Sequence, residues 1–235
     1  MPKKTPGKLN SPPTQAEFDK LPLANLCGPV KGVFYRLHSL NPATGKAWPA
    51  VFFSLRGATR FDPAGGVGTL YIGSSLVGAL MEMFDDRWGP QGDPSRSLTK
   101  RELLQWWVTL LAIPSVTVFE AQQLNLSKIG TDFQLLTGDH AIARKWALRI
   151  MNHPANVGGI LYGSRHDTTR RNVALFKRAG LTPAAYEKTL IPPAAKLGPG
   201  PAKDIGPLLF GREIRLRDHP ELSDALKSLE VAILP

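Results

Sequence analysis

Apolar positions along the chain recur with two different periods, and each period predicts a type of secondary structure. A period of two, or a short apolar run between turn residues, is typical of a strand, because successive side chains point to opposite faces of a sheet. This pattern predicts strands over residues 32–39, 51–55, 69–72, 116–121, 157–164, 172–176 and 213–217.

A period near 3.6 predicts helices, and a capping signal stands at the start of each. Ser74 or Ser75 precedes one helix, Asp139 precedes another, and Pro220 suits the first position of a short terminal helix. The apolar stripes of these helices contain Leu76, Ala79, Leu80 and Met83, then Ile142, Trp146 and Ile150, and finally Leu222, Ala225, Leu226 and Leu229.

A longer helix is expected over residues 100–112. Thr99 and Glu102 have the spacing of a capping box, in which each side chain accepts a hydrogen bond from the backbone N–H of the other residue. Pro114 would end this helix, since proline cannot donate a backbone hydrogen bond. Its expected buried face consists of Leu103, Trp106, Trp107, Leu110 and Leu111.

Composition divides the chain into an arm, a domain and an extension. Residues 1–22 combine prolines with lysines, which predicts a disordered basic arm. Residues 23–185 carry most of the regular patterns and form the expected main domain. Residues 186–235 include the Pro-rich stretch 191–207, so we expect a linker followed by an extension that packs on the domain.

Charge and cysteine content exclude some classes of protein. The chain has 29 basic and 19 acidic residues, a net charge of +10, which favours phosphates, nucleic acid or an acidic protein without choosing among them. Cys27 is the single cysteine, so an internal disulfide and a zinc site built on several cysteines are excluded. The N-terminus lacks an apolar signal region, and the apolar run 103–119 is short for a membrane span. We therefore expect a soluble cytoplasmic protein.

Arg60, Tyr71 and Glu82 are the main candidates for chemistry. They lie eleven residues apart, on an expected loop, strand and helix. A cation, an aromatic ring and a carboxylate suit a phosphate-bearing substrate whose ring is stacked and whose developing positive charge is stabilised. Glu82 falls at the margin of its helix's apolar stripe, so it is either a carboxylate that reaches into a cleft or a solvated helix residue.

Two further candidates lie on expected strands. Arg36 lies between aromatic residues on one face of the strand 32–39, where it contacts either a phosphate or a ring in a cleft, or solvent on an edge strand. Ser164 ends the strand 157–164 beside Arg165. It is placed either to donate a hydrogen bond to a ligand oxygen or to act as a turn serine.

Taken together, these positions resemble the RES domain family, which is named for an arginine, a glutamate and a serine. The resemblance covers roughly residues 30–180, and Gly163 replaces the proline that usually precedes the family's serine. It rests on Phe34-Tyr35-Arg36-Leu37-His38, Arg60-Phe61-Asp62-Pro63, Leu70-Tyr71-Ile72 with Ala79-Leu80-Met81-Glu82, and Gly159-Ile160-Leu161-Tyr162-Gly163-Ser164-Arg165 with Asn172-Val173-Ala174-Leu175-Phe176.

The resemblance implies an α+β fold similar to the diphtheria-toxin type of ADP-ribosyltransferase, with mixed sheets around a central cleft and helices outside. It implies a toxin of a type II toxin–antitoxin pair that depletes NAD+ by hydrolysis or phosphorolysis. NAD+ is then a substrate, inorganic phosphate is the co-substrate of phosphorolysis, and no true cofactor or metal is implied. The implied partner is an Xre-type antitoxin, which binds DNA, so contact with nucleic acid is indirect. A homodimer is also a family expectation, and no membrane contact is expected.

The resemblance also implies roles for individual residues within the catalytic domain. Glu82 stabilises the oxocarbenium character that forms when the nicotinamide–ribose bond breaks, with Arg36 and Tyr71 as further catalytic residues. Arg36 and Arg60 hold the pyrophosphate, and Tyr71 stacks on nicotinamide or ribose. Tyr35 is a second stacking candidate, and Ser164 is placed to hydrogen-bond a ribose or phosphate oxygen.

Other functions are compatible with the same residues. An ADP-ribosyltransferase that modifies a protein would break the same bond first. A basic nucleic-acid-binding module would use the arm of residues 1–22 and the cluster Arg165, Arg170 and Arg171. A degenerate family member would bind NAD+ without turning it over.

Overall fold

The computed structural model describes residues 9–53, 57, 59–63, 67–84, 87–88, 93, 96–163, 170–177 and 213–235. Helices and a mixed sheet together give an α+β fold, as expected. The chain divides into two compact units. Unit 1 is Met1–Val30, Phe53–Tyr71 and Ser115–Pro183, and unit 2 is Lys31–Phe52, Ile72–Pro114 and Ala184–Pro235.

Three strands contribute residues to both units, namely β1 (Cys27–Ser39), β2 (Thr69–Gly73) and β4 (Trp106–Glu120). Both units therefore draw on the region that we expected to be one domain, and unit 2 also contains the C-terminal extension. The strands predicted over residues 32–39, 69–72 and 116–121 are confirmed, the last as the end of a longer strand.

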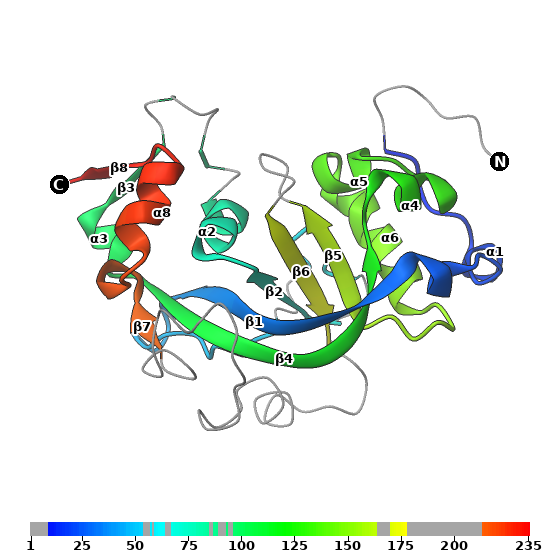
Figure 1. The fold of residues 1–235 in the computed structure, drawn as a ribbon, viewed down its shortest axis with the longest axis horizontal. Coiled ribbons are helices and arrows are strands. Elements are labelled where there is room, and N and C mark those ends of the chain that lie inside the picture. The colour runs from blue at the N-terminus through cyan, green and yellow to red at the C-terminus, as the bar shows by residue number, and fades with distance from the viewer. Residues whose placement is uncertain are drawn as a thin grey trace. The chain divides into compact units, whose positions relative to one another are not determined.

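Unit 1 is built on a β-hairpin of β5 (Gly159–Gly163) and β6 (Arg171–Phe176), which confirms two predicted strands (Figure 1). β5 pairs antiparallel with β6 and parallel with the end of β4, where Phe119 lies opposite Ile160. β2 follows β6, so the strand order in this unit is β2-β6-β5-β4. Its helices are α1 (Gln15–Phe18), η1 (Leu23–Leu26), α4 (Gln123–Lys128), α5 (Gln134–Thr137) and α6 (His140–Met151).

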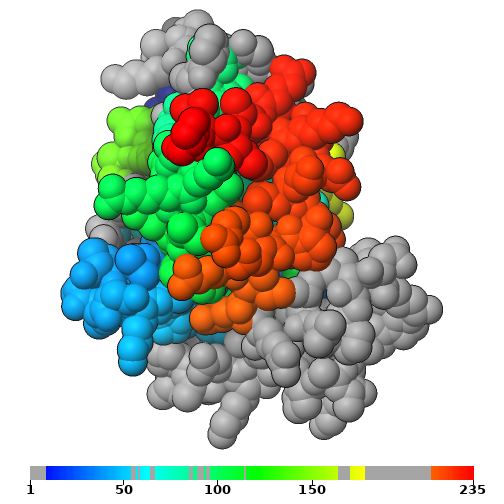
Figure 2. All heavy atoms as spheres, turned by 90° about the vertical axis from the view of Figure 1, so that its left-hand side faces the viewer, coloured from blue at the N-terminus to red at the C-terminus, as the bar shows by residue number. Residues whose placement is uncertain are grey.

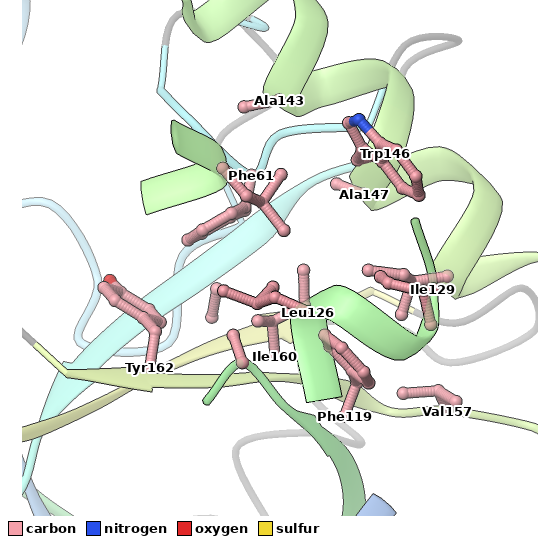
Figure 3. Packing of buried hydrophobic residues seen from close by; sticks show 14 of the residues in the cluster. Phe61, Phe119, Leu126, Ile129, Ala143, Trp146, Ala147, Val157, Ile160 and Tyr162 are labelled. Atoms are coloured by element: carbon pink, nitrogen blue, oxygen red, sulfur yellow. The ribbon is translucent and has the colours of Figure 1, made fainter. Parts of the chain in front are cut away.

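The core of unit 1 forms between its strands and helix α6. Trp146 from α6, Ile160 from β5 and Phe119 from β4 converge on one buried cluster (Figure 3). The predicted cap of α6 is confirmed, because the Asp139 carboxylate accepts a hydrogen bond from the Ala141 backbone N–H at 2.6 Å. Of the predicted inward residues, Trp146 and Ile150 are buried and Ile142 is partly buried against the cluster.

The N-terminal segment packs in unit 1 from residue 9 onward. Leu9 and Phe18 are buried, and α1 begins with a capping box between Thr14 and Glu17. The Trp146 indole N–H also donates a hydrogen bond to the Asn10 carbonyl at 2.8 Å. The prediction of a disordered arm is therefore wrong for residues 9–22, because apolar side chains among the prolines are buried. Residues 1–8 lie outside the described part of the chain.

Unit 2 contains strand pairings of the large sheet, in which β1 also pairs with β4, and a small parallel sheet. Tyr35 of β1 lies opposite Gly73 of β2, and Trp107 of β4 lies opposite Arg215 of β7 (Ile214–Arg215). The small sheet pairs β3 (Ser97–Thr99) with β8 (Ala232–Leu234). The helices of this unit are α2 (Leu76–Phe84), α3 (Lys100–Leu103), η4 (Leu216–Asp218) and α8 (Leu222–Ser228).

Helices α2 and α8 share the core of unit 2. The cluster includes Leu76, Ala79 and Leu80 from α2, and Leu222, Ala225 and Leu226 from α8. The predicted terminal helix and its buried face are confirmed, with Leu229 buried just beyond its end, but the helix begins at Leu222 and not at Pro220. Figure 2 shows the C-terminal residues in orange and red beside the green residues near position 100.

The predicted helix over residues 100–112 is wrong. Its capping box does form, with the Thr99 N–H donating to the Glu102 carboxylate at 2.7 Å, but α3 ends at Leu103. The long strand β4 follows, and Pro114 lies inside that strand. The continuous run Val108–Leu111 is buried on both faces of β4, and such a run fits a helical stripe as well as a buried strand.

Two other predicted strands differ from the structure. Of the segment 51–55, residues 51–53 are described and form no strand. The strand expected over 213–217 is reduced to β7, and Leu216 and Arg217 belong to η4. Among the described residues, no helix is long and apolar enough to cross a membrane.

Candidate functional site

In unit 1, the loop that carries Arg60 is held by the hydroxyl group of Tyr71. This oxygen accepts hydrogen bonds from the Thr59 hydroxyl and from the Phe61 backbone N–H, each at 2.8 Å. The Asp62 carboxylate also accepts a hydrogen bond from the Thr59 N–H at 3.2 Å. Strand β2 therefore fixes the residues on either side of Arg60, and the predicted partners Arg60 and Tyr71 are brought together.

The guanidinium group of Arg60 is itself oriented by the start of α6. Its Nη1 donates to the Gly138 carbonyl at 2.6 Å, and its Nη2 lies 2.9 Å from Nε2 of His140. Because arginine only donates hydrogen bonds, Nε2 of His140 is the acceptor, and this ring carries no proton there. A half-buried arginine held at two nitrogens presents its charge in a fixed direction.

In unit 2, Arg36 lies on β1 between buried residues. Its side chain is half-buried, and the neighbouring positions on the same face, Phe34 and His38, are buried. The His38 ring contacts the Trp48 carbonyl at 2.6 Å and the Thr109 hydroxyl at 3.0 Å. Burial lowers the pKa of His38 to about 4, and the charge of Arg36 also favours the neutral form.

Tyr35, the second stacking candidate, is attached to the C-terminal segment. Its hydroxyl donates to the carboxylate of Glu221, with distances of 3.0 and 3.1 Å to the two oxygens. Its ring lies 6.1 Å from the ring of His219. Burial raises the pKa of Tyr35 far above its ordinary value, and the negative charge of Glu221 raises it further. The hydroxyl therefore stays protonated and acts as a donor.

Glu82 lies on α2 next to the buried Met81. The helix begins as predicted, with the Ser75 hydroxyl accepting a hydrogen bond from the Gly78 N–H at 3.1 Å. The Glu82 side chain is exposed, so the carboxylate lies on the solvent side of the apolar stripe. An exposed carboxylate can approach a ligand without a conformational change of the helix.

The candidate residues are divided between the units. Arg60 and Tyr71 belong to unit 1, and Tyr35, Arg36 and Glu82 belong to unit 2. Ser164 lies outside the described residues, as does Arg165 of the proposed basic cluster. Arg170 is half-buried and Arg171 is exposed.

Cysteine and metal chemistry receive no support from the described residues. The Cys27 thiol donates to the Leu23 carbonyl at 3.1 Å, and burial raises its pKa to about 11. A thiol with that pKa is a poor nucleophile near neutral pH. In the part of the chain that the structure describes, no group of three or more His, Cys, Asp and Glu residues is placed to bind a metal.

Sequence reasoning missed the residues that hold the candidates in place. Gly138 and His140 contact Arg60 across 78 and 80 residues of chain, and Glu221 contacts Tyr35 across 186. The order of residues along the chain contains no local signal of such contacts. Only co-variation between homologous sequences would have indicated them.

Comparison with known proteins now identifies the family. A family model of the RES domain matches residues 33–193. The chain belongs to the RES domain family. No curated protein matches the chain. Among solved structures, a chain of the M. tuberculosis MbcT–MbcA toxin–antitoxin complex is similar, with 14% identity, a TM-score of 0.45, and coverage of 74% of this chain and 96% of that chain.

The RES domain match encloses the candidate residues but not every element that supports them. Arg36, Arg60, Tyr71 and Glu82 all lie within it, as do the contacts of Arg60 with the start of α6. The C-terminal segment 213–235, which supplies Glu221 and helix α8, lies beyond it.

Proposed function

We propose that this RES domain protein cleaves the bond between nicotinamide and ribose in NAD+ and acts as the toxin of a toxin–antitoxin pair. The family match over residues 33–193 carries the proposal, because it encloses a carboxylate, two arginines and a tyrosine suited to this substrate. The contacts of Arg60 and Tyr71 and the exposure of Glu82 support it.

Glu82 is the proposed electrostatic stabiliser of the reaction. The C1′–N bond breaks, its electron pair leaves with nicotinamide, and positive charge develops on the ribose. A fixed carboxylate beside that charge stabilises the transition state more than the ground state. Because nicotinamide departs as a neutral ring, no general acid is needed. Water or phosphate then attacks C1′ and releases a proton to solvent.

The arginines supply the proposed contacts with the pyrophosphate. Arg60 is oriented before substrate arrives, so little side-chain entropy is lost when it binds a phosphate oxygen. Arg36 is a proposed phosphate contact through charge-assisted hydrogen bonds. The Tyr71 hydroxyl is used in holding the loop, so its ring is the part proposed to stack on the substrate. Tyr35 and Ser164 remain proposed secondary contacts.

The proposal is tested by incubating the purified full chain with labelled NAD+, with and without phosphate, and with a protein extract. We expect loss of NAD+ with release of nicotinamide and of ADP-ribose, or of phosphorylated ADP-ribose when phosphate is the acceptor. Label on protein instead would identify an ADP-ribosyltransferase. Unchanged NAD+ in every arm would refute the proposal.

The cellular role follows from NAD+ depletion and has a separate test. A chain that consumes NAD+ in the cytoplasm needs a cognate antitoxin, for which we propose an Xre-type protein. Expression of the chain alone should stop growth, and Glu82→Ala should restore it. Growth arrest that persists in Glu82→Ala would show that the toxicity does not come from this site.

A further inference from the structure

The C-terminal segment 213–235 packs on the elements that carry Arg36 and Glu82, although it lies beyond the RES domain match. Its helix α8 buries apolar residues in the same cluster as α2, which carries Glu82. Its residue Glu221 accepts a hydrogen bond from Tyr35, the neighbour of Arg36 on β1. Figure 2 shows the surface of this segment in orange and red.

The bond between Tyr35 and Glu221 is the polar part of this packing. A phenol that donates to a carboxylate makes a charge-assisted hydrogen bond, which is roughly twice as strong as a neutral one. Both carboxylate oxygens lie within 3.1 Å of the hydroxyl. The contact therefore tolerates small rotations of the carboxylate and restricts the phenol ring.

His219 fixes the turn that presents Glu221. The Glu221 backbone N–H donates to Nδ1 of His219 at 3.2 Å. The buried His219 ring also packs on the Tyr35 ring at an interplanar angle of 60°. The backbone and the side chain of Glu221 are thus both oriented toward β1.

A short path of contacts leads from Tyr35 to α2. Tyr35 lies opposite Gly73 in the β1–β2 pair. A Cβ atom at Gly73 would lie 2.7 Å from the backbone nitrogen of Ala79, so the strand lies directly against the helix. Ala79 precedes Glu82 by three residues, which is slightly less than one helical turn. A shift of β1 at Tyr35 would therefore move α2.

We propose that Glu221 is a positioning residue that holds Arg36 and Glu82 in place through Tyr35. The proposal rests on the proposed NAD+ cleavage, and it assigns to the C-terminal segment a part in the site. Tyr35 and Arg36 are consecutive on β1, so their side chains point to opposite faces. When Glu221 of the C-terminal segment fixes the Tyr35 side chain, it therefore also sets the direction of the Arg36 side chain.

The test compares variants of the full chain in NAD+ cleavage. Glu221→Ala should lower kcat/KM about tenfold, the scale of one hydrogen bond to a charged group. Glu221→Gln keeps an acceptor oxygen and should lose only about threefold. Asp224→Asn removes an exposed carboxylate from α8 and should match the wild type. Tyr35→Phe should resemble Glu221→Ala, and the double variant should be no worse than either, because both remove one interaction.

Hydrogen exchange supplies a readout that does not depend on the reaction. Amides of residues 33–38 and 76–84 should exchange faster in Glu221→Ala than in Asp224→Asn. Wild-type kcat/KM in Glu221→Ala, or additive losses in the double variant, would overturn the proposal while NAD+ cleavage stands. Unchanged exchange in both segments would overturn it as well, whatever the substrate is. If the wild type cleaves no NAD+, the proposed function fails, and the exchange result still decides whether Glu221 positions β1 and α2.

Discussion

The two arginines proposed to bind the pyrophosphate are held in different ways. Arg60 in unit 1 is oriented by Gly138 and His140, and its loop is fixed by Tyr71, all within the RES domain match. Arg36 in unit 2 lies on β1 next to Tyr35. The Tyr35 hydroxyl donates a hydrogen bond to Glu221, which lies beyond that match. The contacts described for Arg60 thus lie within the family match, whereas the neighbour of Arg36 also contacts a residue beyond it.

The chemistry of the two supports also differs. The Tyr71 hydroxyl holds the loop that carries Arg60, and the Gly138 carbonyl and the His140 imidazole hold its guanidinium group. The support of Arg36 combines a carboxylate, a buried histidine and an apolar helix face. We therefore expect the support of Arg60 to weaken when single hydrogen bonds are removed. The support of Arg36 should also weaken with changes in pH and with substitutions in the core.

Between the two supports, the largest expected effects come from the arginines themselves. Arg60→Ala and Arg36→Ala should each lower kcat/KM for NAD+ by roughly 30- to 100-fold, the scale of one or two charge-assisted hydrogen bonds. Arg36→Ala should weaken substrate binding as well as rate. Steady-state kinetics measures both parameters, and Arg217→Ala is the control, since Arg217 is exposed and bonds only to its neighbour Asp218 among the described residues. If Arg60→Ala is as active as the control, Arg60 does not contribute to NAD+ cleavage.

A smaller effect is expected when the hydroxyl of Tyr71 is removed. Tyr71→Phe keeps the ring but leaves the Thr59 hydroxyl and the Phe61 N–H without their acceptor, so KM should rise about tenfold with a lesser change in kcat. Thr59→Val removes one of the two bonds and should give an intermediate KM. If Tyr71 acts only by stacking, Tyr71→Phe will behave as the wild type.

The sequence predicted local features well. The capping residues Ser75, Thr99 and Asp139 act as expected, and α8 buries the predicted stripe. These features depend on residues within a few positions of one another, so the local pattern of the sequence predicts them. The family model also confirms the family that the motifs around Arg36, Arg60, Tyr71 and Glu82 resemble.

Features that depend on distant partners could not be predicted. The apolar run of β4 fits a helix or a strand, and only its pairing with β5 and β7 decides between them. The prolines and lysines of residues 1–22 predicted disorder, but Leu9 and Phe18 are buried in the core cluster of unit 1. The contacts of Arg60 with His140 and of Tyr35 with Glu221 join segments that no periodicity relates.

The smallest expected effect concerns the pH dependence of stability in unit 2. Burial lowers the pKa of His38 and of His219 to about 4 from 6.5. Unfolding therefore takes up protons, and the free energy of unfolding falls as the pH drops from 6.5 toward 4. Denaturant midpoints at pH 7 and at pH 4.5, followed by circular dichroism, should show this loss. His38→Gln and His219→Gln should each reduce the difference between the two pH values, and an unchanged difference in both would contradict the assignment.

The central claim is that Glu82 on helix α2 stabilises the cleavage of NAD+, and one measurement tests it most directly. The rate of nicotinamide release is compared between the wild type and Glu82→Gln, with circular dichroism and the unfolding midpoint as checks of folding. Because the exposed side chain makes no contribution to the buried cluster, the variant should fold normally. We expect its rate to fall at least ~100-fold, the scale of losing one electrostatic stabiliser. A folded Glu82→Gln protein that releases nicotinamide at the wild-type rate would contradict the account.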